Sequence, residues 1–319
     1  MPATIRFPQP GRTPLDRPST VTRRISWRYA APIVILHLLA MVACAPWFFS
    51  WTGMVLLVAG VYFYGTVGID IAYHRLLTHR SFKCPIWLER FFVVVALCCL
   101  EDAPASWVST HRLHHNDADE TPDPHSPLVT FFWSHVGWLL VQNRDVHCAS
   151  AYDRHARDVL RDPFYMHLQR NVLTVVGIYV AHAMLYFLAG VLAVWAATGQ
   201  FAGATQFGLS LVAWGVVLRT VCVWHMSWSV NSLAHLYGYR SYETGENSRN
   251  NWFVAILTSG EGWHNNHHED PSSACNSRRW WEIDLVYGVI RTLEMLGLAT
   301  NVVRPRRQRL AQPVQKRAA

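Results

Sequence analysis

Nine of the 17 histidines stand in four short clusters along the chain. The stretch GEGWHNNHH carries three of them and THRLHH carries three more, in both cases at offsets 0, 3 and 4. Residues at these offsets project from one face of a helix, so each stretch can present two or three imidazoles to one site. Neutral imidazole binds iron, copper and zinc well, and nine ligands are too many for one ion. We therefore predict a site for two metal ions, formed by His74, His79, His111, His114, His115, His235, His264, His267 and His268.

The other two motifs, HRLLTH and NSLAH, lack this spacing. His74 and His79 are five residues apart, which places them roughly 140° apart around a regular helix. Either the helix ends between them, near Thr78, or they bind different ions, and a two-metal site makes the second interpretation the natural one. Asn231 precedes His235 by four residues and shares its helix face. We predict that the Asn231 amide binds a metal weakly or through water, the alternative being a helix cap.

The other histidines and the nearby carboxylates have supporting interpretations. His37 and His182 lie in apolar segments, where a contact between helices explains them. Six histidines lack the cluster spacing and are interpreted as loop, interface or supporting groups: His125, His135, His147, His155, His167 and His225. A metal-bound imidazole commonly donates its other ring N–H to a carboxylate. Candidate acceptors are Asp70, Asp117, Glu261 and Glu269, and a solvated helix face is the alternative for each.

The composition is typical of a membrane protein. Hydrophobic residues make up 51% of the chain and charged residues only 15%, against about 25% charged in soluble domains. Four apolar stretches, at 29–49, 51–69, 171–195 and 206–226, are long enough to cross a bilayer. Short connections join them in pairs. We predict an all-α integral membrane protein with four transmembrane helices in two hairpins.

The distribution of charge predicts the orientation of this bundle. Of 28 Lys and Arg residues, only Arg219 lies inside a predicted span, and neither hairpin tip carries any. The positive-inside rule then places both termini and the segments 70–170 and 227–302 in the cytoplasm. We expect Arg219 to snorkel toward that side. All nine clustered histidines fall in these two segments, which predicts a helical cytoplasmic cap that holds the metals.

We predict a single domain, 29–302, between two basic tails. Residues 1–28 contain six Arg and several Pro and are expected to be disordered. Residues 303–319 are basic and suit solvent or lipid headgroups. The basic residues form no face interleaved with aromatics, which argues against nucleic acid. The seven cysteines contain no CxxC pair, which argues against zinc ribbons and iron–sulfur clusters.

A histidine cage at a membrane surface suits the oxidation of lipid chains. Breaking an unactivated C–H bond demands a very strong oxidant, and two irons can share the electrons that dioxygen activation requires. A hydrolytic dizinc site needs neither a membrane nor a ligand set almost free of carboxylate. A metal transporter would hold its ligands near the middle of the spans, whereas these lie beyond the span ends.

The ordered motifs HRLLTH, HRLHH, NSLAH and GEGWHNNHH, with paired spans between them, resemble the integral-membrane fatty acyl Δ9 desaturases. The flanking stretches THRSF, DPHSP, FFWSHVGWLL and WWEIDLVY agree with this family. The similarity runs from Val67 to Leu298 and is strongest to the bacterial, cyanobacterial and plastid branch.

The resemblance implies a non-haem di-iron enzyme that uses dioxygen and two electrons to place a cis double bond between carbons 9 and 10 of a saturated C16 or C18 acyl chain. It implies that the nine histidines bind two irons and that Asn231 contacts one of them through water. A bent substrate tunnel is expected, with Trp107, Ser227 and Trp228 near the bend. Chain depth is expected to be set on the second span, at Tyr62, Thr66 and Asp70.

The sequence departs from the family in residues that concern the acyl carrier. Animal acyl-CoA enzymes have basic residues where this chain has Gln142 and Asn143, and amides where it has Glu101 and Asp102. Acyl-CoA and acyl-lipid substrates are therefore both open, ahead of acyl-carrier protein. A related membrane hydroxylase or ketolase is the alternative reaction.

Electrons must come from a separate protein, because the sequence has no flavin, haem or iron–sulfur signature. The family resemblance implies a ferredoxin or a cytochrome b5-like donor at the cytoplasmic face. Its candidate contacts are Arg112, Arg240 and Arg249.

Overall fold

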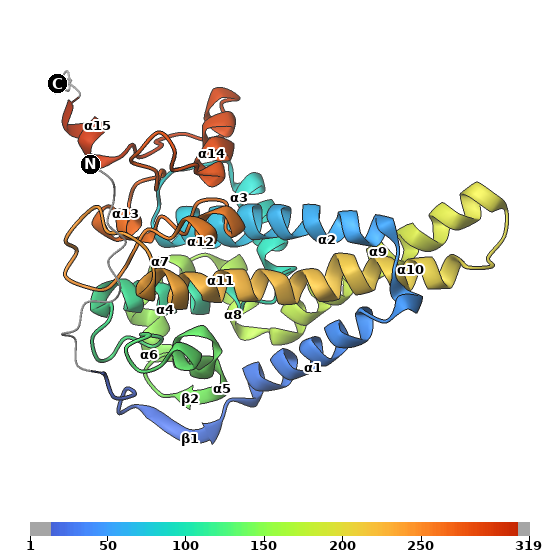
Figure 1. Ribbon diagram of the computed structural model, residues 1–319, viewed down its shortest axis with the longest axis horizontal. Helices are drawn as coiled ribbons and strands as arrows, with labels where there is room; N and C mark the ends of the chain where they lie inside the picture. Colours follow the sequence, from blue (N-terminus) through green and yellow to red (C-terminus); the bar gives the residue numbers. More distant parts are fainter. Residues whose placement is uncertain (1–13, 312–319) are drawn as a thin grey trace.

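The computed structural model describes residues 14–311, and it is built from long helices that run along one axis with a cap of shorter helices at one end (Figure 1). The long helices are α1 (Trp27–Ala43), α2 (Trp51–Phe63) continued by the π-helix η2 (Tyr64–Thr78), α9 (Val172–Thr198), and α10 (Ala204–Val212) continued by the π-helix η4 (Ala213–Leu218) and α11 (Arg219–Leu236). A short 3₁₀ helix, η1 (Pro46–Phe48), joins α1 to α2.

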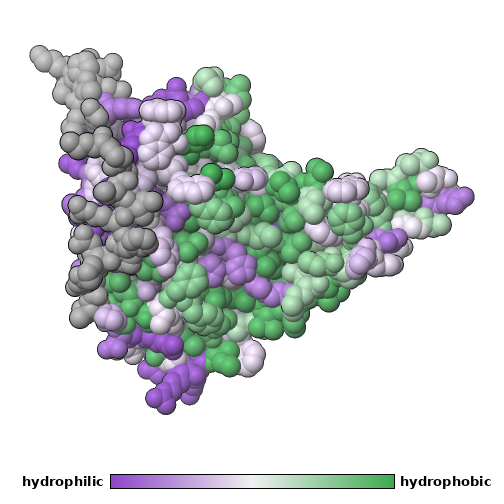
Figure 2. Space-filling view, viewed as in Figure 1, coloured by the Kyte–Doolittle hydropathy of each residue, from purple (hydrophilic) through white to green (hydrophobic). Residues whose placement is uncertain are grey.

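Three of these helical segments are long and apolar enough to cross a membrane. They comprise Trp51–Thr78, Val172–Thr198 and Ala204–Leu236, with 28, 27 and 33 residues. Helix α1 is also apolar but has 17 residues, and at 1.5 Å per residue it is slightly shorter than a hydrocarbon layer of about 30 Å. Figure 2 shows that hydrophobic residues cover this elongated part of the molecule, whereas hydrophilic residues gather toward the cap. Three membrane-spanning candidates are thus present, and the fourth span remains a prediction.

Small residues permit the tight packing of the α9–α10 hairpin. Gly199 ends α9 in the left-handed conformation, at φ +68°, which glycine adopts without steric cost. Gly190 then lies so close to Gly208 that an added Cβ would stand 2.7 Å from the Gly208 Cα. The two helices therefore pack backbone against backbone.

The cap (residues 79–171 and 237–311) consists of short helices and loops. Its first part contains α3 (Ile86–Leu97), α4 (Pro104–Asp117), the π-helix η3 (Trp133–Gly137), α5 (Trp138–Leu140), α6 (Ala149–His155), α7 (Arg157–Leu160) and α8 (Pro163–Arg170). Its second part contains α12 (Trp252–Leu257), α13 (His264–Glu269), α14 (Leu285–Met295) and α15 (Arg306–Ala311). The largest cluster of buried apolar residues joins η2 to α3, α4 and α14, so the cap and the long helices share one core.

The structure corrects two sequence predictions about basic residues, one for the N-terminal tail and one for Arg219. Part of the tail predicted to be disordered forms strand β1 (Val21–Ile25), which pairs antiparallel with β2 (Val141–Asn143), because the extended backbone finds hydrogen-bond partners there. The part of that prediction that concerns residues 1–13 lies outside the described residues. Arg219 does not snorkel. It is fully buried, and its guanidinium donates to the Cys98 carbonyl at 2.9 Å and lies over the Tyr64 ring.

The helices also extend further into the cap than the predicted spans. The second predicted span ends at residue 69 and the fourth at 226, but the helices continue to Thr78 and Leu236. His74, Asn231 and His235 therefore sit on rigid helix extensions and not in loops or separate segments that follow the spans. A rigid support of this kind holds side chains in a more defined geometry than a loop does.

Candidate metal centre

All nine predicted histidines come together at the junction of the long helices and the cap, where they form two groups. In each group the potential ligand atoms all lie within 4.8 Å of one another. The five-histidine group contains His74, His79, His111, His115 and His267. The four-histidine group contains His114, His235, His264 and His268. We refer to the two groups together as the cage.

The imidazoles of the cage point their Nε2 atoms toward one another. In the five-histidine group, the Nε2 of His267 lies 3.1 Å from that of His74 and 3.0 Å from that of His115. In the four-histidine group, the Nε2 of His264 lies 3.1 Å from that of His235 and 3.1 Å from that of His268. Lone pairs that face each other at such distances repel unless a cation or proton lies between them. The convergent nitrogens therefore fit metal ions.

Burial keeps five of the cage imidazoles in the form that binds metal. Burial, reinforced by the neighbouring imidazoles, holds the pKa of His111, His115 and His267 well below the usual value. The same causes lower the pKa of His264 and His268. Since only a neutral imidazole has a free lone pair, the environment favours ligation over protonation.

The π-helix explains how His74 and His79 reach the same group. Residues five apart point in different directions on an α-helix, but a π-helix has hydrogen bonds from residue i to i+5. The N–H of His79 donates to the carbonyl of His74 at 3.1 Å, which is a bond of this kind. Helix η2 ends at Thr78, and both imidazoles join the five-histidine group. The two imidazoles thus lie in one group, and the helix ends at Thr78, as the first interpretation expected.

Each histidine triplet contributes to both groups. On α4, His111 and His115 belong to the five-histidine group and His114 to the other. On α13 the division is reversed, since His264 and His268 belong to the four-histidine group and His267 to the five-histidine group. The (i, i+4) pair of each helix thus faces one group and the intervening histidine faces the other, which places the groups side by side.

Carboxylates fix the orientation of three cage imidazoles through their Nδ1 atoms, on the side of each ring away from the cage centre. The Nδ1–H of His74 donates to Glu261 at 2.9 Å, that of His235 to Asp119 at 2.9 Å and that of His114 to Asp123 at 3.0 Å. Burial alone would raise the pKa of Glu261, but Arg75 and His74 outweigh it and lower the pKa to about 2. For Asp119, too, burial acts to raise the pKa, but His235 holds it below its usual value. These ionised carboxylates keep the Nε2 atoms directed inward.

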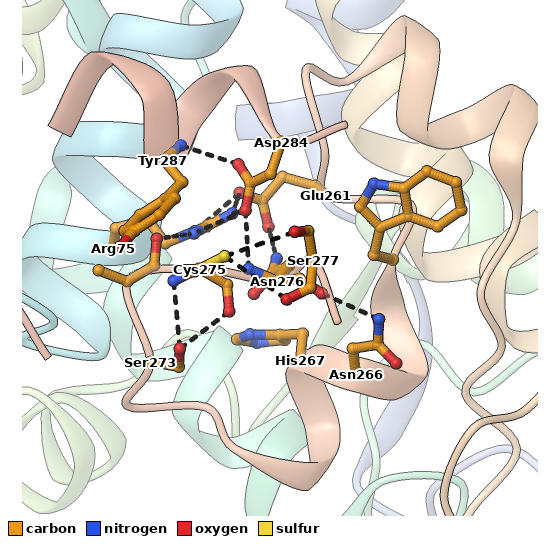
Figure 3. A network of polar contacts seen from close by, with 12 residues as sticks. Arg75, Glu261, Asn266, His267, Ser273, Cys275, Asn276, Ser277, Asp284 and Tyr287 are labelled. Atoms are coloured by element: carbon orange, nitrogen blue, oxygen red, sulfur yellow. Dashed lines mark hydrogen bonds and ion pairs between the residues drawn. The ribbon is translucent and has the colours of Figure 1, made fainter. Parts of the chain in front are cut away.

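Glu261 is itself held by a buried network on η2 and the loop before α14 (Figure 3). Arg75, fully buried, donates two hydrogen bonds to Glu261, at 2.9 and 2.6 Å, and a third to the Ala274 carbonyl at 2.5 Å. Asn276 donates to the second Glu261 oxygen at 3.1 Å. The charged groups Arg75 and Glu261 are therefore paired despite their burial, as a charge far from water requires.

Sequence reasoning found only one of the three supporting carboxylates. Glu261 was among the four candidates, whereas Asp119 and Asp123 were missed, although both stand shortly after the HRLHH motif in the turn DADETPDPH. Asp117 and Glu269 form no hydrogen bond or ion pair with the cage in the described part of the chain, and Glu269 lies 3.7 Å from Arg306 instead. Asp70 lines a cavity beside His74 without bonding to it.

The two histidines predicted to join helices do so. His37 lies 3.1 Å from His225 across the seam between α1 and α11, measured between their Nε2 atoms. His182 on α9 bonds the Tyr64 hydroxyl at 2.8 Å. The Nδ1 of His225 lies 3.0 Å from the Nε2 of His135, so three histidines form a chain separate from the cage.

Two adjacent cavities that share lining residues lie beside the cage. The outer cavity, of about 110 Å³, lies between α1, α4 and α11 and is lined partly by Tyr29, Asp102 and Trp228. The inner cavity, of about 50 Å³, continues between η2 and α11. Four residues line both cavities and so mark the neck between them: Trp107, His111, Ser227 and Asn231. A slot therefore passes directly along the cage.

Most of the predicted substrate residues lie on this slot. Trp107 stacks on His111, with ring centroids 5.0 Å apart. Ser227 and Asn231 line the neck, and Trp228 lines the outer cavity. Tyr62 and Thr66 do not line either cavity. Tyr62 lines a separate groove, and the hydroxyl of Thr66 donates a hydrogen bond to that of Ser259.

Glu101 stands at the neck and was recognised in the sequence only as a departure from the family. One of its oxygens accepts hydrogen bonds from Ser227 at 2.9 Å and Trp107 at 3.4 Å. Burial raises the pKa of Glu101 to about 8, although both hydrogen bonds act in the opposite direction. Unlike the carboxylates behind the cage, Glu101 is therefore a neutral acid at pH 7.

Comparisons with known proteins agree with this site. The family model described as fatty acid desaturase matches residues 50–302. The sn-1 stearoyl-lipid 9-desaturase of Anabaena variabilis is 40% identical over 88% of this chain and 94% of its own length. The acyl-CoA 5-desaturase AL21 of Anemone leveillei is 40% identical over 89% and 84%, and the sn-2 palmitoyl-lipid 9-desaturase of Nostoc sp. (strain 36) is 37% identical over 88% and 91%.

This chain belongs to the fatty acid desaturase family. It is an oxidoreductase that introduces a double bond into a fatty acyl chain.

Proposed function

We propose that this enzyme is a di-iron Δ9 desaturase whose substrate is an acyl group carried on a membrane lipid. The observation that carries the proposal is the slot of two cavities that passes along a cage of nine convergent imidazoles. The five-histidine group would hold one iron and the four-histidine group the other. Asn231, on the wall of the neck beside the smaller group, would contact one iron through water.

The residues of the chain then have distinct tasks. The irons, when bound, supply the power to activate dioxygen and remove hydrogen from an unactivated methylene. The cage would hold them through its Nε2 atoms, and Glu261, Asp119 and Asp123 fix three of the imidazoles by accepting hydrogen bonds from their Nδ1–H groups. Trp107 and Ser227 hold the chain at the neck next to His111. Because carbons 9 and 10 look like their neighbours chemically, the position of the double bond follows from how deep the chain reaches past this neck.

The outer cavity favours an acyl-lipid over an acyl-CoA. Of the described residues that line it, none is Lys or Arg, whereas Glu101 and Asp102 are both acidic. The nearby Arg28 is already paired with Asp102 at 2.8 Å. A site for the phosphates of CoA needs unpaired cations, and the described residues that line this cavity supply none. A glycerolipid that remains in the bilayer needs no such cations.

The positive-inside rule supports a multi-pass protein of the inner membrane, with the cage and both termini in the cytoplasm. We propose that a ferredoxin or a cytochrome b5-like protein docks there and supplies two electrons. Two of the three arginines suggested for this contact do not fit it. Arg249 is buried, and Arg112 is bound to Asp158 at 2.7 Å and to the Thr78 carbonyl at 2.9 Å.

Expression in an auxotroph for unsaturated fatty acids tests the reaction. Rescue of growth, with a cis-9 double bond found by mass spectrometry of the lipids, is the expected result. A hydroxy or keto acid as the main product would instead identify a hydroxylase or ketolase. The carrier is tested in isolated membranes supplied with labelled acyl-CoA or labelled phospholipid and glycolipid. We expect the labelled acyl group to become unsaturated while it remains on the supplied lipid, without passing through acyl-CoA.

A further inference from the structure

Part of the cap surface is apolar although it lies outside the candidate spans. It is formed by α12 and the segment 280–285 before α14, where six large side chains are each more than half exposed: Trp252, Phe253, Ile256, Trp280, Ile283 and Leu285. Four of the six line one groove of about 400 Å³. We refer to these six residues and their groove as the apolar face. A contiguous exposed patch of this kind marks a contact with another molecule or with a membrane.

The apolar face continues an exposed stripe of α2. Val55, Val58 and Tyr62 are exposed and stand at offsets 0, 3 and 7, so they share one side of that helix. Tyr62 also lines the groove, together with Ile256 and Leu285. The exposed apolar surface therefore runs from the candidate span Trp51–Thr78 onto the cap.

The position of Tyr62 along its helix gives the depth of the groove. Tyr62 stands 11 positions after Trp51, which begins α2 at the hairpin tip, and this is about 16 Å at 1.5 Å per residue. The hydrocarbon layer of a bilayer is about 30 Å thick. A span that begins at Trp51 thus places Tyr62 near the middle of the layer. Helix α12 and the segment 280–285 border the same groove, so they reach into the half of the layer next to the cap.

The segment 280–285 directs its apolar side chains outward and its carboxylates inward. Glu282 and Asp284 stand among the exposed residues, but their side chains are only 0% and 2% exposed. Glu282 accepts a hydrogen bond from the Asn266 amide at 2.9 Å, and Asp284 accepts one from the Tyr287 N–H at 2.8 Å. A surface in contact with water shows the opposite distribution, since carboxylates are usually exposed. The segment is therefore suited to an apolar medium.

The residues at the start of this segment are typical of a membrane interface. Arg278 and Arg279 directly precede Trp280 and Trp281. Tryptophan is enriched at the level of the lipid headgroups, and arginine extends its charged end toward them. The order of basic, aromatic and then aliphatic residues leads from the headgroups into the hydrocarbon, which Ile283 then contacts.

We propose that the apolar face is inserted into the leaflet next to the cap, with the hydrocarbon tail of a bilayer lipid in the groove beside Tyr62 and with Trp280 at the level of the headgroups. The partner is lipid and not a second copy of this chain, because the face continues a candidate span at the depth of the hydrocarbon. This inference depends on the candidate spans and not on the reaction proposed above.

The insertion joins the membrane to the cage. Asp284, in the inserted segment, lies 3.5 Å from Arg75 and accepts a hydrogen bond from the Asn276 N–H at 2.7 Å (Figure 3). Arg75 and Asn276 both donate to Glu261, the carboxylate that orients His74. The cage is thus held close to the membrane surface by the same network that fixes one of its imidazoles.

Photo-crosslinking tests the insertion. In the full chain, p-benzoylphenylalanine, which attacks nearby C–H bonds under light, replaces Ile283 or Phe253, and the protein is placed in nanodiscs of phosphatidylethanolamine and phosphatidylglycerol. We expect mass spectrometry to show a mass increase of one lipid, attached through its acyl chain. The same replacement at Val58, in the span, is the positive control. At Glu243, a cap residue whose side chain is 90% exposed, no lipid adduct is expected.

A second measurement uses the reactivity of a new thiol. Ile283→Cys and Glu243→Cys are treated in membranes with a water-soluble maleimide, and the labelling of the unmodified protein is subtracted. Only the thiolate reacts, and each unit by which an apolar medium raises the pKa of a thiol lowers the thiolate fraction about tenfold. We therefore expect labelling at position 283 to be at least about tenfold slower than at 243.

Three results would overturn the inference. The apolar face lies in water if Val58 gives a lipid adduct but positions 283 and 253 do not, or if the two thiols react at equal rates. A crosslink between two protein chains at 283 or 253 would identify a second copy as the partner. If Val58 also gives no lipid adduct, the placement of the span in the bilayer fails, whereas formation of a double bond by the enzyme would still support the proposed reaction.

Discussion

The molecule contains two clusters of histidines that differ in arrangement. In the cage, the nitrogens of each group converge to within 4.8 Å, and carboxylates hold three of the imidazoles from behind. In the seam between α1 and α11, His37, His225 and His135 form a linear chain, in which His225 uses a different nitrogen for each neighbour. Figure 2 shows a hydrophilic patch within the hydrophobic face near these helices.

The comparison shows that imidazoles alone do not make a metal site. A ligand set forms where the backbone directs several nitrogens to one point and where a carboxylate removes the choice of tautomer. The seam histidines lack both features, and they satisfy each other as hydrogen-bond partners between helices. The following predictions test this distinction, from the largest expected effect to the smallest.

Replacement of a central cage ligand should abolish the reaction. His267 lies between His74 and His115 in the five-histidine group, so His267→Ala leaves that group open. We expect no detectable unsaturated product and less iron per chain by elemental analysis, while the protein remains in the membrane fraction. Normal iron content and product would show that the nitrogens converge without binding metal.

Loss of a supporting carboxylate should weaken the cage without removing a ligand. Asp119→Asn replaces the acceptor of the His235 Nδ1–H, and losses of about 10–100-fold in metal affinity or activity are usual for such changes. Both are measured by iron titration and product formation. The control is Asp117→Asn, two residues away, which has no bond to the cage and should behave as the unmodified enzyme. Equal behaviour of the two variants would argue against the orienting role of Asp119.

The Glu101 carboxyl bonds to no histidine. Its contribution to folding stability should change with pH in the opposite sense from that of Glu261. Its folded pKa of about 8 exceeds the ordinary 4.5, so the folded state binds the extra proton. Stability is therefore full below pH 4.5 and falls as pH rises toward about 8, by roughly 1.4 kcal/mol per pH unit. Glu101→Gln stays neutral and should remove this decline in thermal unfolding measured across the range. Parallel curves for the two proteins would mean that Glu101 is ionised.

The seam histidines should matter least. His225→Leu removes two contacts between elements, and such polar contacts in membranes average about 0.6 kcal/mol. We expect a small decrease in thermal stability, with iron content and product unchanged. A marked loss of iron would place the seam among the metal sites and would erase the contrast with the cage.

Several features were predictable from the sequence because they depend on local spacing. Six of the nine cage histidines follow from offsets that share a helix face, and the candidate membrane helices follow from apolar runs long enough to cross a bilayer. Glu261 was also found, because it precedes His264 within one short motif. Such patterns need no knowledge of which distant segments meet.

Other features depend on how distant segments fold together. The division of nine histidines into groups of five and four follows from the placement of α4 and α13 against η2 and α11, and no spacing rule encodes it. His74 and His79 reach the same group because η2 is a π-helix. This helix packs against α3 and α4. Asp119 becomes a partner of His235 only because residues 116 positions apart are brought into contact. The sequence alone determined which residues could bind metal, whereas the tertiary structure decided which of them lie in one group and which carboxylates orient them, because both depend on long-range packing.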